Sequence, residues 1–236
     1  MNVRAITASI AHEIRQPLAA VATQASAALR WLDKTPPRQD EARDSLSKIK
    51  VAAQRTSDVF DGVRTLFGRV DQGRQPVHVN EVVQEVIESL RAELRDRRVD
   101  PQVELAAELP VVAGHRGQLQ EVVFNLVNNA IEAMDSTPSN SRILWVKTEP
   151  FDDKAIVVSI EDTGPGIDPQ RMDSIFGVGH TTKAKGTGLG LAISRMIAED
   201  HGGRLTATSD GKSGARFQFV LPVEPMEYAA PLSPGR

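Results

Sequence analysis

Residues 9–18 read SIAHEIRQPL and lie within a longer segment whose apolar residues recur every three or four positions. This spacing predicts a helix over residues 2–34, with one apolar face formed by Ile6, Ile10, Ile14, Leu18, Val21, Ala25, Leu29 and Leu32. His12 is two positions from Ile10, which is about 200° of helical rotation, so we expect it to face outward beside Glu13. Taken alone, a histidine on a helix surface is more often an ordinary surface residue than a functional one.

Prolines define the next two features of the chain. Pro17 lies one turn after the His-Glu pair, where its missing N–H predicts a kinked or loosened helix. Pro36-Pro37 ends this helix, and a second one is predicted from Gln39 to about Val70. Its apolar positions alternate spacings of three and four, with one polar member, at Leu46, Ile49, Ala53, Thr56, Phe60, Val63, Phe67 and Val70.

Two long helices joined by a short turn form an antiparallel hairpin. A single hairpin cannot bury both apolar faces, so we expect a homodimer in which two hairpins make a four-helix bundle. The alternative is that the hairpin packs against the rest of its own chain. The coiled-coil character of the stripe favours the dimer.

Composition indicates an ordinary water-soluble protein. The chain has 236 residues, of which 40% are hydrophobic and 25% charged, enough for one large domain or two small ones. A net charge of -3 gives no reason to expect nucleic acid or an anionic membrane as a partner. The chain has no cysteine, which excludes disulfides and thiolate chemistry. We expect no membrane segment and a cytoplasmic location, since no long apolar run or signal-peptide pattern is present.

The polar segment DQGRQP at residues 71–76 predicts a boundary. It divides the chain into residues 1–72, residues 73–222 and a proline-rich tail at 223–236. In the second unit, period-two patterns predict strands at 77–79, 99–105, 111–113, 143–148, 155–160, 205–208 and 215–221. Helices are predicted at 80–97, capped by Asn80, at 115–134, and at 187–200, closed by Gly202-Gly203. The second unit is therefore expected to be a mixed sheet layered with helices, and the whole chain an α+β protein.

One predicted helix carries a polar stripe. Glu121, Asn125 and Asn129 are spaced by four and share a face. Amide and carboxylate oxygens at that spacing suit a hard cation such as Mg²⁺ that also holds phosphates. An ordinary pair of surface asparagines is the alternative.

Two glycine-rich segments follow. DTGPGI at 162–167 comes directly after a predicted strand, where an aspartate next to glycines offers an acceptor that a ligand can approach closely, although an ordinary Asp-Gly turn fits as well. GTGLGL at 186–191 opens a predicted helix, so free N–H groups there can meet an anion. The segment between them, at 168–185, is long and basic enough to act as a lid over phosphates.

The order His-Glu-x-x-x-Pro, Asn-x-x-x-Asn, Asp-x-Gly-x-Gly and Gly-x-Gly-x-Gly closely resembles the bacterial sensor histidine kinases of two-component systems, over about residues 2–222. The resemblance implies a dimerisation and histidine phosphotransfer hairpin, followed by an α/β sandwich that binds ATP and Mg²⁺. That sandwich is the fold shared with type II topoisomerases, mismatch-repair ATPases and the heat-shock chaperone ATPase. It also implies autophosphorylation from ATP and transfer to an aspartate of a response regulator.

The resemblance also assigns roles to residues. His12 matches the phosphoacceptor and Glu13 the residue that orients it and takes its proton. Asn125 and Asn129 match the Mg²⁺–phosphate site, with Asn129 as metal ligand, and Asp162 matches the acceptor for the adenine amino group. The other nucleotide-binding positions implied are Gly164, Gly166, Ile167, Thr181, Thr182, Lys183, Gly186, Thr187, Gly188, Leu189 and Gly190.

Gln16 lies one turn after His12, where many relatives carry Thr or Asn and dephosphorylate the regulator. Its amide can orient a water molecule, so we expect weak regulator phosphatase activity. Two competing hypotheses are an ATPase or serine kinase that uses the hairpin only to dimerise, and a scaffold that binds the regulator without phosphorylating it. The HEIRQP segment argues against the first, and the intact asparagine and glycine motifs argue against the second.

Overall fold

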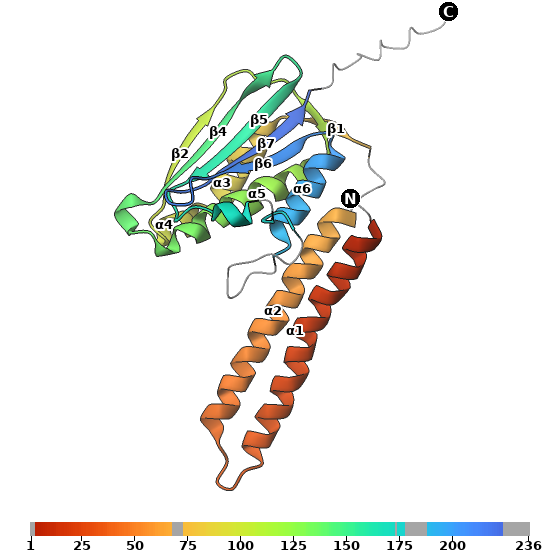
Figure 1. Cartoon of the computed structure of the whole chain (residues 1–236), viewed down its shortest axis with the longest axis vertical. Helices are drawn as coiled ribbons and strands as arrows, with labels where there is room; N and C mark the ends of the chain where they lie inside the picture. Colours follow the sequence, from red (N-terminus) through yellow and green to blue (C-terminus); the bar gives the residue numbers. More distant parts are fainter. Residues whose placement is uncertain (1–2, 68–72, 173, 178–187, 224–236) are drawn as a thin grey trace, which may run out of the picture.

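The computed structural model describes residues 3–67, 73–172, 174–177 and 188–223. A helical hairpin of α1 (Val3–Leu32) and α2 (Gln39–Phe67) extends away from a second unit in which helices cover one face of a sheet (Figure 1). The predicted α+β architecture is confirmed. Within the described part of the chain, no helix is both long and apolar enough to cross a membrane.

α1 continues through Pro17 as one helix, so Pro17 does not end it, and a kink at this position stays a prediction. A proline removes one backbone hydrogen bond, and packing on α2 along the helix holds the turns on either side. At the far end the hairpin turn is closed by the Arg38 N–H, which donates to the Trp31 carbonyl at 2.9 Å. The Lys34 ammonium lies 4.5 Å from the centre of the Trp31 ring.

The two helices contact each other mainly through small residues. Ala28 of α1 and Ala42, Ser45 and Ala52 of α2 are buried in the hairpin, so the two backbones approach closely. Part of the predicted apolar faces lies outside this contact: Leu18, Leu29 and Leu32 of α1 and Leu46 of α2 are 45–63% exposed. The hairpin alone therefore leaves an apolar surface uncovered, as its periodicity predicts.

The main sheet has the strand order β2-β4-β5-β7-β6. Its strands are β2 (Asp100–Leu105), β4 (Ile143–Asp152), β5 (Ala155–Asp162), β6 (Arg204–Thr208) and β7 (Arg216–Pro222). β2 pairs parallel with β4 and the other pairs are antiparallel. A separate two-stranded ribbon consists of β1 (Gln75–Val77) and β3 (Val112–Gly114).

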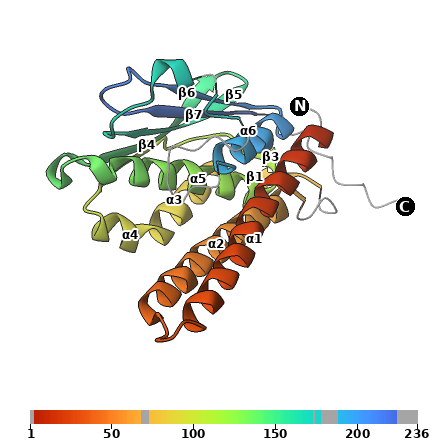
Figure 2. The ribbon, with the colours of Figure 1, turned by 60° about the horizontal axis from the view of Figure 1, so that its bottom comes forward.

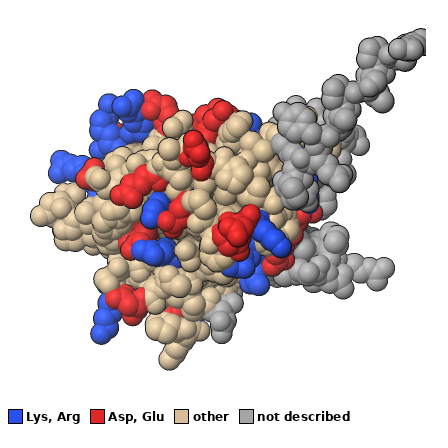
Figure 3. Space-filling view, turned by 90° about the horizontal axis from the view of Figure 1, so that it is seen from above, with Lys and Arg blue, Asp and Glu red and all other residues tan. Residues whose placement is uncertain are grey.

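Helices lie against one face of this sheet (Figure 2). They are α3 (Val79–Ser89), α4 (Arg91–Asp96), α5 (Arg116–Ala133) and α6 (Gly190–Asp200), with short 3₁₀ turns η1 (Met134–Ser136), η2 (Ser139–Ser141) and η3 (Pro169–Arg171). The apolar face predicted for residues 115–134 is buried at all seven positions, which are Met134 in η1 and, on α5, Leu119, Val122, Val123, Leu126, Val127 and Ala130. Acidic and basic side chains are interspersed on the end of the molecule opposite the hairpin tip (Figure 3).

The helix predicted at 80–97 consists of two helices, because α3 ends at Ser89 and α4 begins at Arg91. Asn80 is not its cap, since α3 begins at Val79. The Asn80 side chain instead donates to the Ala106 carbonyl at 2.8 Å and accepts from the Thr148 hydroxyl at 2.7 Å. The Asn80 side chain therefore bonds to residues distant in sequence and not to the start of its own helix.

Several predicted ends differ by a few residues. β4 runs to Asp152 rather than 148, because it forms a long hairpin with β5, and β5 continues to Asp162 rather than ending at 160. α6 begins at Gly190, and the predicted start at Thr187 lies outside the described residues. Its end is as predicted: Gly202 has a φ of +72°, and the Gly203 N–H donates to the Ala198 carbonyl at 2.9 Å.

Candidate functional site

Asp162 is a buried carboxylate at the end of a central strand. Its side chain points to the helix-covered face of β5, and the residue is only 4% exposed. One carboxylate oxygen, Oδ1, accepts a hydrogen bond from the Gly164 N–H at 2.7 Å. Burial raises the pKa of Asp162 from 3.8 to about 6, while this hydrogen bond acts in the opposite direction. Such a carboxylate is suited to accept a hydrogen bond from a ligand that enters the pocket.

Gly164 and Gly166 lie where a side chain would not fit. A Cβ on Gly164 would lie 2.7 Å from Asp162 Oδ1 and 3.2 Å from the Ala133 Cβ at the end of α5. Gly166 has a φ of +80°, and a Cβ there would lie 2.9 Å from the Ser209 hydroxyl. That hydroxyl also accepts from the Ile167 N–H at 2.9 Å. The turn after β5 is therefore held between α5 and the loop that follows β6.

The polar stripe of α5 meets the start of α6. The Asn125 amide donates to Glu121 Oε1 at 3.1 Å. A Cβ on Gly190, the first residue of α6, would lie 3.4 Å from the amide oxygen of Asn125. Gly188 has a φ of +67°, the left-handed conformation that favours glycine, and Leu189 between these glycines is buried. Asn129 lies one turn along α5 and is half-buried.

These two clusters lie at defined positions along α5. Ala133 contacts Gly164, and Asn125 contacts Gly190. Ala133 and Asn125 are eight positions apart on the helix, a rise of about 12 Å. One end of the site thus offers a buried carboxylate, and the other offers amide groups beside the first turn of a helix, where backbone N–H groups attract anions.

The hairpin reaches this unit close to the predicted phosphoacceptor. Ile14, two residues after His12, packs against the core of the sheet unit, and α2 contacts α5 and α6 (Figures 1 and 2). The backbone of His12 and Glu13 belongs to α1, but their side chains lie outside the described residues. Gln16 is exposed on α1.

Five predicted nucleotide-binding residues also lie outside the described part of the chain: Thr181, Thr182, Lys183, Gly186 and Thr187. Those that are described fall into two groups. Asp162 lies with Gly164, Gly166 and Ile167, and Asn125 lies with Gly190, which directly follows Gly188 and Leu189, while Asn129 is one turn along α5 from Asn125. Sequence reasoning missed Ala133 and Ser209, which contact the first group. Neither had a recognisable signal, because a small residue on a helix and a serine in a loop are common everywhere.

Two family profiles match the chain. Residues 2–71 match the profile described as the His Kinase A (phospho-acceptor) domain. Residues 114–225 match the profile described as the histidine kinase-, DNA gyrase B- and HSP90-like ATPase. The two matches occur in the order that the motifs predict.

Known sensor kinases are similar along most of this chain. The sensor histidine kinase TmoS of Ectopseudomonas mendocina is 35% identical over 217 residues, which cover 92% of this chain and 22% of TmoS. The sensor protein FixL of Bradyrhizobium diazoefficiens is 32% identical, over 92% of this chain and 43% of FixL. The chain thus spans less than half the length of these two relatives.

Solved structures agree with this assignment. The catalytic domain of the histidine kinase ThkA is 33% identical, with a TM-score of 0.58 over 65% of this chain and 100% of that domain. ThkA in complex with the response regulator protein TrrA is 25% identical, with a TM-score of 0.68 over 94% of this chain and 62% of that chain. From both family profiles, these relatives and the shared fold, we conclude that this chain belongs to the bacterial sensor histidine kinases of two-component systems.

Proposed function

We propose that this chain uses ATP to phosphorylate His12 and passes the phosphoryl group to an aspartate of a response regulator. Residues 1–72 are assigned to dimerisation and phosphotransfer, and residues 73–222 to catalysis. The observation that carries the proposal is the arrangement along α5, where the turn with the buried carboxylate contacts Ala133, the anion-attracting helix start contacts Asn125, and these two positions are about 12 Å apart along the helix. An extended nucleoside triphosphate has its base at one end and its phosphates at the other, and it fits that arrangement.

At the base end, Asp162 is suited to accept a hydrogen bond from the adenine amino group. Gly164, Gly166 and Ile167 form the adjoining wall, where the absence of side chains on the glycines lets the base approach the backbone. At the phosphate end we assign contacts to the second glycine segment and the residues before it, namely Thr181, Thr182, Lys183, Gly186, Thr187, Gly188, Leu189 and Gly190. ATP is made and held in the cytoplasm, which favours a cytoplasmic location for this unit.

The donor set at the phosphate end fits Mg²⁺. Because the Asn125 nitrogen donates to Glu121, its amide oxygen faces the start of α6, and Asn129 lies one turn away. Mg²⁺ prefers oxygen ligands and usually takes one or two from the protein and the rest from phosphates and water. We assign Asn129 as its protein ligand. When bound, Mg²⁺ would neutralise phosphate charge as the γ-phosphoryl group departs.

His12 supplies the nucleophile. One imidazole nitrogen must be unprotonated so that its lone pair can form a bond to the γ-phosphorus while the bond from that phosphorus to the ADP oxygen breaks. Glu13 is the adjacent carboxylate that holds the proton on the other nitrogen and receives it. The catalytic unit must approach the hairpin for this step, and its present contact with Ile14 shows that it reaches this part of α1.

The exposed leucines of the hairpin support a homodimer. Leu29 follows buried Ala28, and Leu46 follows buried Ser45, so each is rotated by about 100° from the α1–α2 contact. In antiparallel helices the same rotation brings both residues to one side of the hairpin. A second copy that covers this side would complete a four-helix bundle. The complex of ThkA with TrrA supports a response regulator as the other partner.

The test is incorporation of phosphate from γ-labelled ATP. We expect label that is labile in acid and stable in alkali, lost in His12→Gln and retained in His78→Gln, a matched change of an exposed histidine. His12→Gln should still bind ATP. Alkali-labile label would indicate a serine kinase, no label with intact ATP binding would indicate a scaffold, and full label in His12→Gln would place the acceptor elsewhere.

A further inference from the structure

Thr163 lies between the two residues that form the base end of the site. Its hydroxyl donates to the Ser141 carbonyl at 2.6 Å and accepts from the Ile143 N–H at 2.9 Å. The same oxygen lies 3.4 Å from the sulfur of Met134, directly after α5. The hydroxyl therefore joins the end of β5 to the start of β4 and contacts the end of α5.

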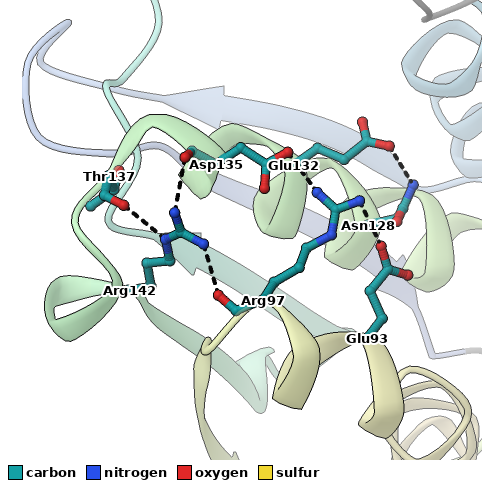
Figure 4. Close-up of polar contacts among 7 residues, drawn as sticks. All are labelled: Glu93, Arg97, Asn128, Glu132, Asp135, Thr137 and Arg142. Carbon is teal, nitrogen blue, oxygen red and sulfur yellow. Dashed lines mark hydrogen bonds and ion pairs between the residues drawn. The ribbon is translucent and has the colours of Figure 1, made fainter.

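The backbone of Thr163 is held from the other side. Its carbonyl accepts from the Thr137 hydroxyl at 3.3 Å. The Thr137 segment is in turn fixed by Arg142, whose guanidinium donates to the carbonyls of Thr137, Asp135 and Arg97 at 2.8, 2.9 and 2.7 Å (Figure 4). Arg97 also pairs with the Asp135 carboxylate at 2.6 Å. These contacts hold the segment 134–142 in place behind Thr163.

The residues at the base end of the site are closely packed. Gly164 contacts Ala133 so closely that a Cβ would lie 3.2 Å from the alanine methyl. Asp162 Oδ1 is oriented by the Gly164 N–H. A small rotation of the turn that contains Thr163 would change both the direction of this carboxylate and the width between β5 and α5.

We infer that Thr163 is a positioning residue for adenine recognition, which fixes the turn carrying Asp162 and Gly164 against the end of α5. This inference rests on the proposed function. Thr163 needs no contact with the nucleotide, because it acts through the two residues beside it. Arg142 supports the same turn from behind. The specificity of the site for a base with an amino group at C6 thus depends on a hydroxyl between β4 and β5.

The test uses the full chain with Mg²⁺ and compares the dissociation constants of ATP and GTP. GTP carries a carbonyl oxygen where adenine carries its amino group, so a correctly placed carboxylate favours ATP. Thr163→Val keeps the shape of the side chain and removes the hydroxyl. We expect it to weaken ATP binding by about 10- to 100-fold, the range for a hydrogen bond to a charged group, and to change GTP binding much less. Thr163→Ser keeps the hydroxyl and should retain the wild-type ratio of ATP to GTP affinity.

Two further variants separate positioning from general damage. Arg142→Lys cannot reach three carbonyls at once and should lower the ATP-to-GTP ratio in the same direction, which keeps the test open if Thr163→Val does not fold. Thr206→Val, an exposed change on β6, should leave the ratio unchanged.

Equal weakening of ATP and GTP in Thr163→Val, or an unchanged ratio in both Thr163→Val and Arg142→Lys, would overturn the inference. Loss of the wild-type ratio in Thr163→Ser would also overturn it. A wild-type chain that binds neither nucleotide would instead refute the proposed function.

Discussion

Asp162 is a charge that the protein retains at a cost to its own stability. Burial raises its pKa from 3.8 to about 6, so the folded chain resists ionisation of this carboxyl. A shift of about two pKa units corresponds to about 3 kcal/mol, at 1.36 kcal/mol per unit. Asp162→Asn keeps the shape and the oxygen that accepts from the Gly164 N–H but carries no charge. We expect this variant to be more stable than the wild type at neutral pH.

The pH dependence has a definite sign. Between about pH 4 and pH 6 the folded protein holds a proton on Asp162 that the unfolded chain has released, so stability falls as the pH rises through this window. Asp162→Asn has no carboxyl group at this position, so its stability lacks this dependence on pH. The difference in unfolding free energy between variant and wild type should therefore grow by about 2.4 kcal/mol from pH 4 to pH 7.5 and stay constant above that.

Urea unfolding measures this difference if the sheet unit is observed separately. The two tryptophans are Trp31 in the hairpin and Trp145 on β4. In a Trp31→Phe background, Trp145 fluorescence reports the sheet unit in both proteins. Calorimetry with ATP should show the opposite effect, affinity lowered by about 10- to 100-fold, because the amide nitrogen cannot accept from the adenine amino group.

Equal urea midpoints for variant and wild type at pH 7.5 would refute the claim that the buried Asp162 carboxylate destabilises the folded protein. A stability difference that is already complete at pH 4 would show that the gain comes from packing and not from ionisation. Weaker ATP binding with no stability gain would leave the pocket assignment intact but would contradict the electrostatic reasoning.

Three other predictions test the geometry. Gly164→Ala places a Cβ 2.7 Å from the Asp162 carboxylate and should lower ATP affinity by more than tenfold in a titration. Gly190→Ala places a Cβ at an ordinary contact of 3.4 Å and should change ATP affinity by a few fold at most. Gln16→Ala should autophosphorylate like the wild type and dephosphorylate the regulator more slowly; a loss of autophosphorylation with the fold intact would instead place Gln16 in the kinase site. Leu29→Glu should shift the protein from dimer to monomer in light scattering, while Val51→Glu, on the opposite side of the hairpin, should remain a dimer. A dimer that persists in Leu29→Glu would place the interface elsewhere.

Periodicity predicted the elements best where a whole face is buried. All seven apolar positions predicted for the helix at 115–134, six on α5 and one in η1, are in the core, because a long helix with a consistent stripe has only one way to bury it. It failed where one residue had two possible partners. Asn80 was assigned as a helix cap and instead bonds to Ala106 and Thr148, which are close only after β4 has paired with β2.

The hairpin shows the same limit. The stripe on α2 was predicted as one seam, but α1 is packed against Ser45 and Ala52, and Leu46 remains exposed. The spacing of apolar residues in the sequence shows which of them share roughly one face of a helix. Small residues that allow two backbones to approach then decide the rotation of each helix, and they give no strong hydrophobic signal.

The sequence by itself determined the order of the parts: an apolar-striped hairpin with a His-Glu pair, then a helix with spaced asparagines, then two glycine segments. These features depend on residue types at short separations, which the chain carries whether or not it is folded. Only the tertiary structure decided which of them meet: that Ala133 and Gly164 contact each other, that Gly190 lies against Asn125, and that Asp162 is buried enough to raise its pKa. Burial and close approach are properties of packed elements distant in sequence, so no local pattern could specify them.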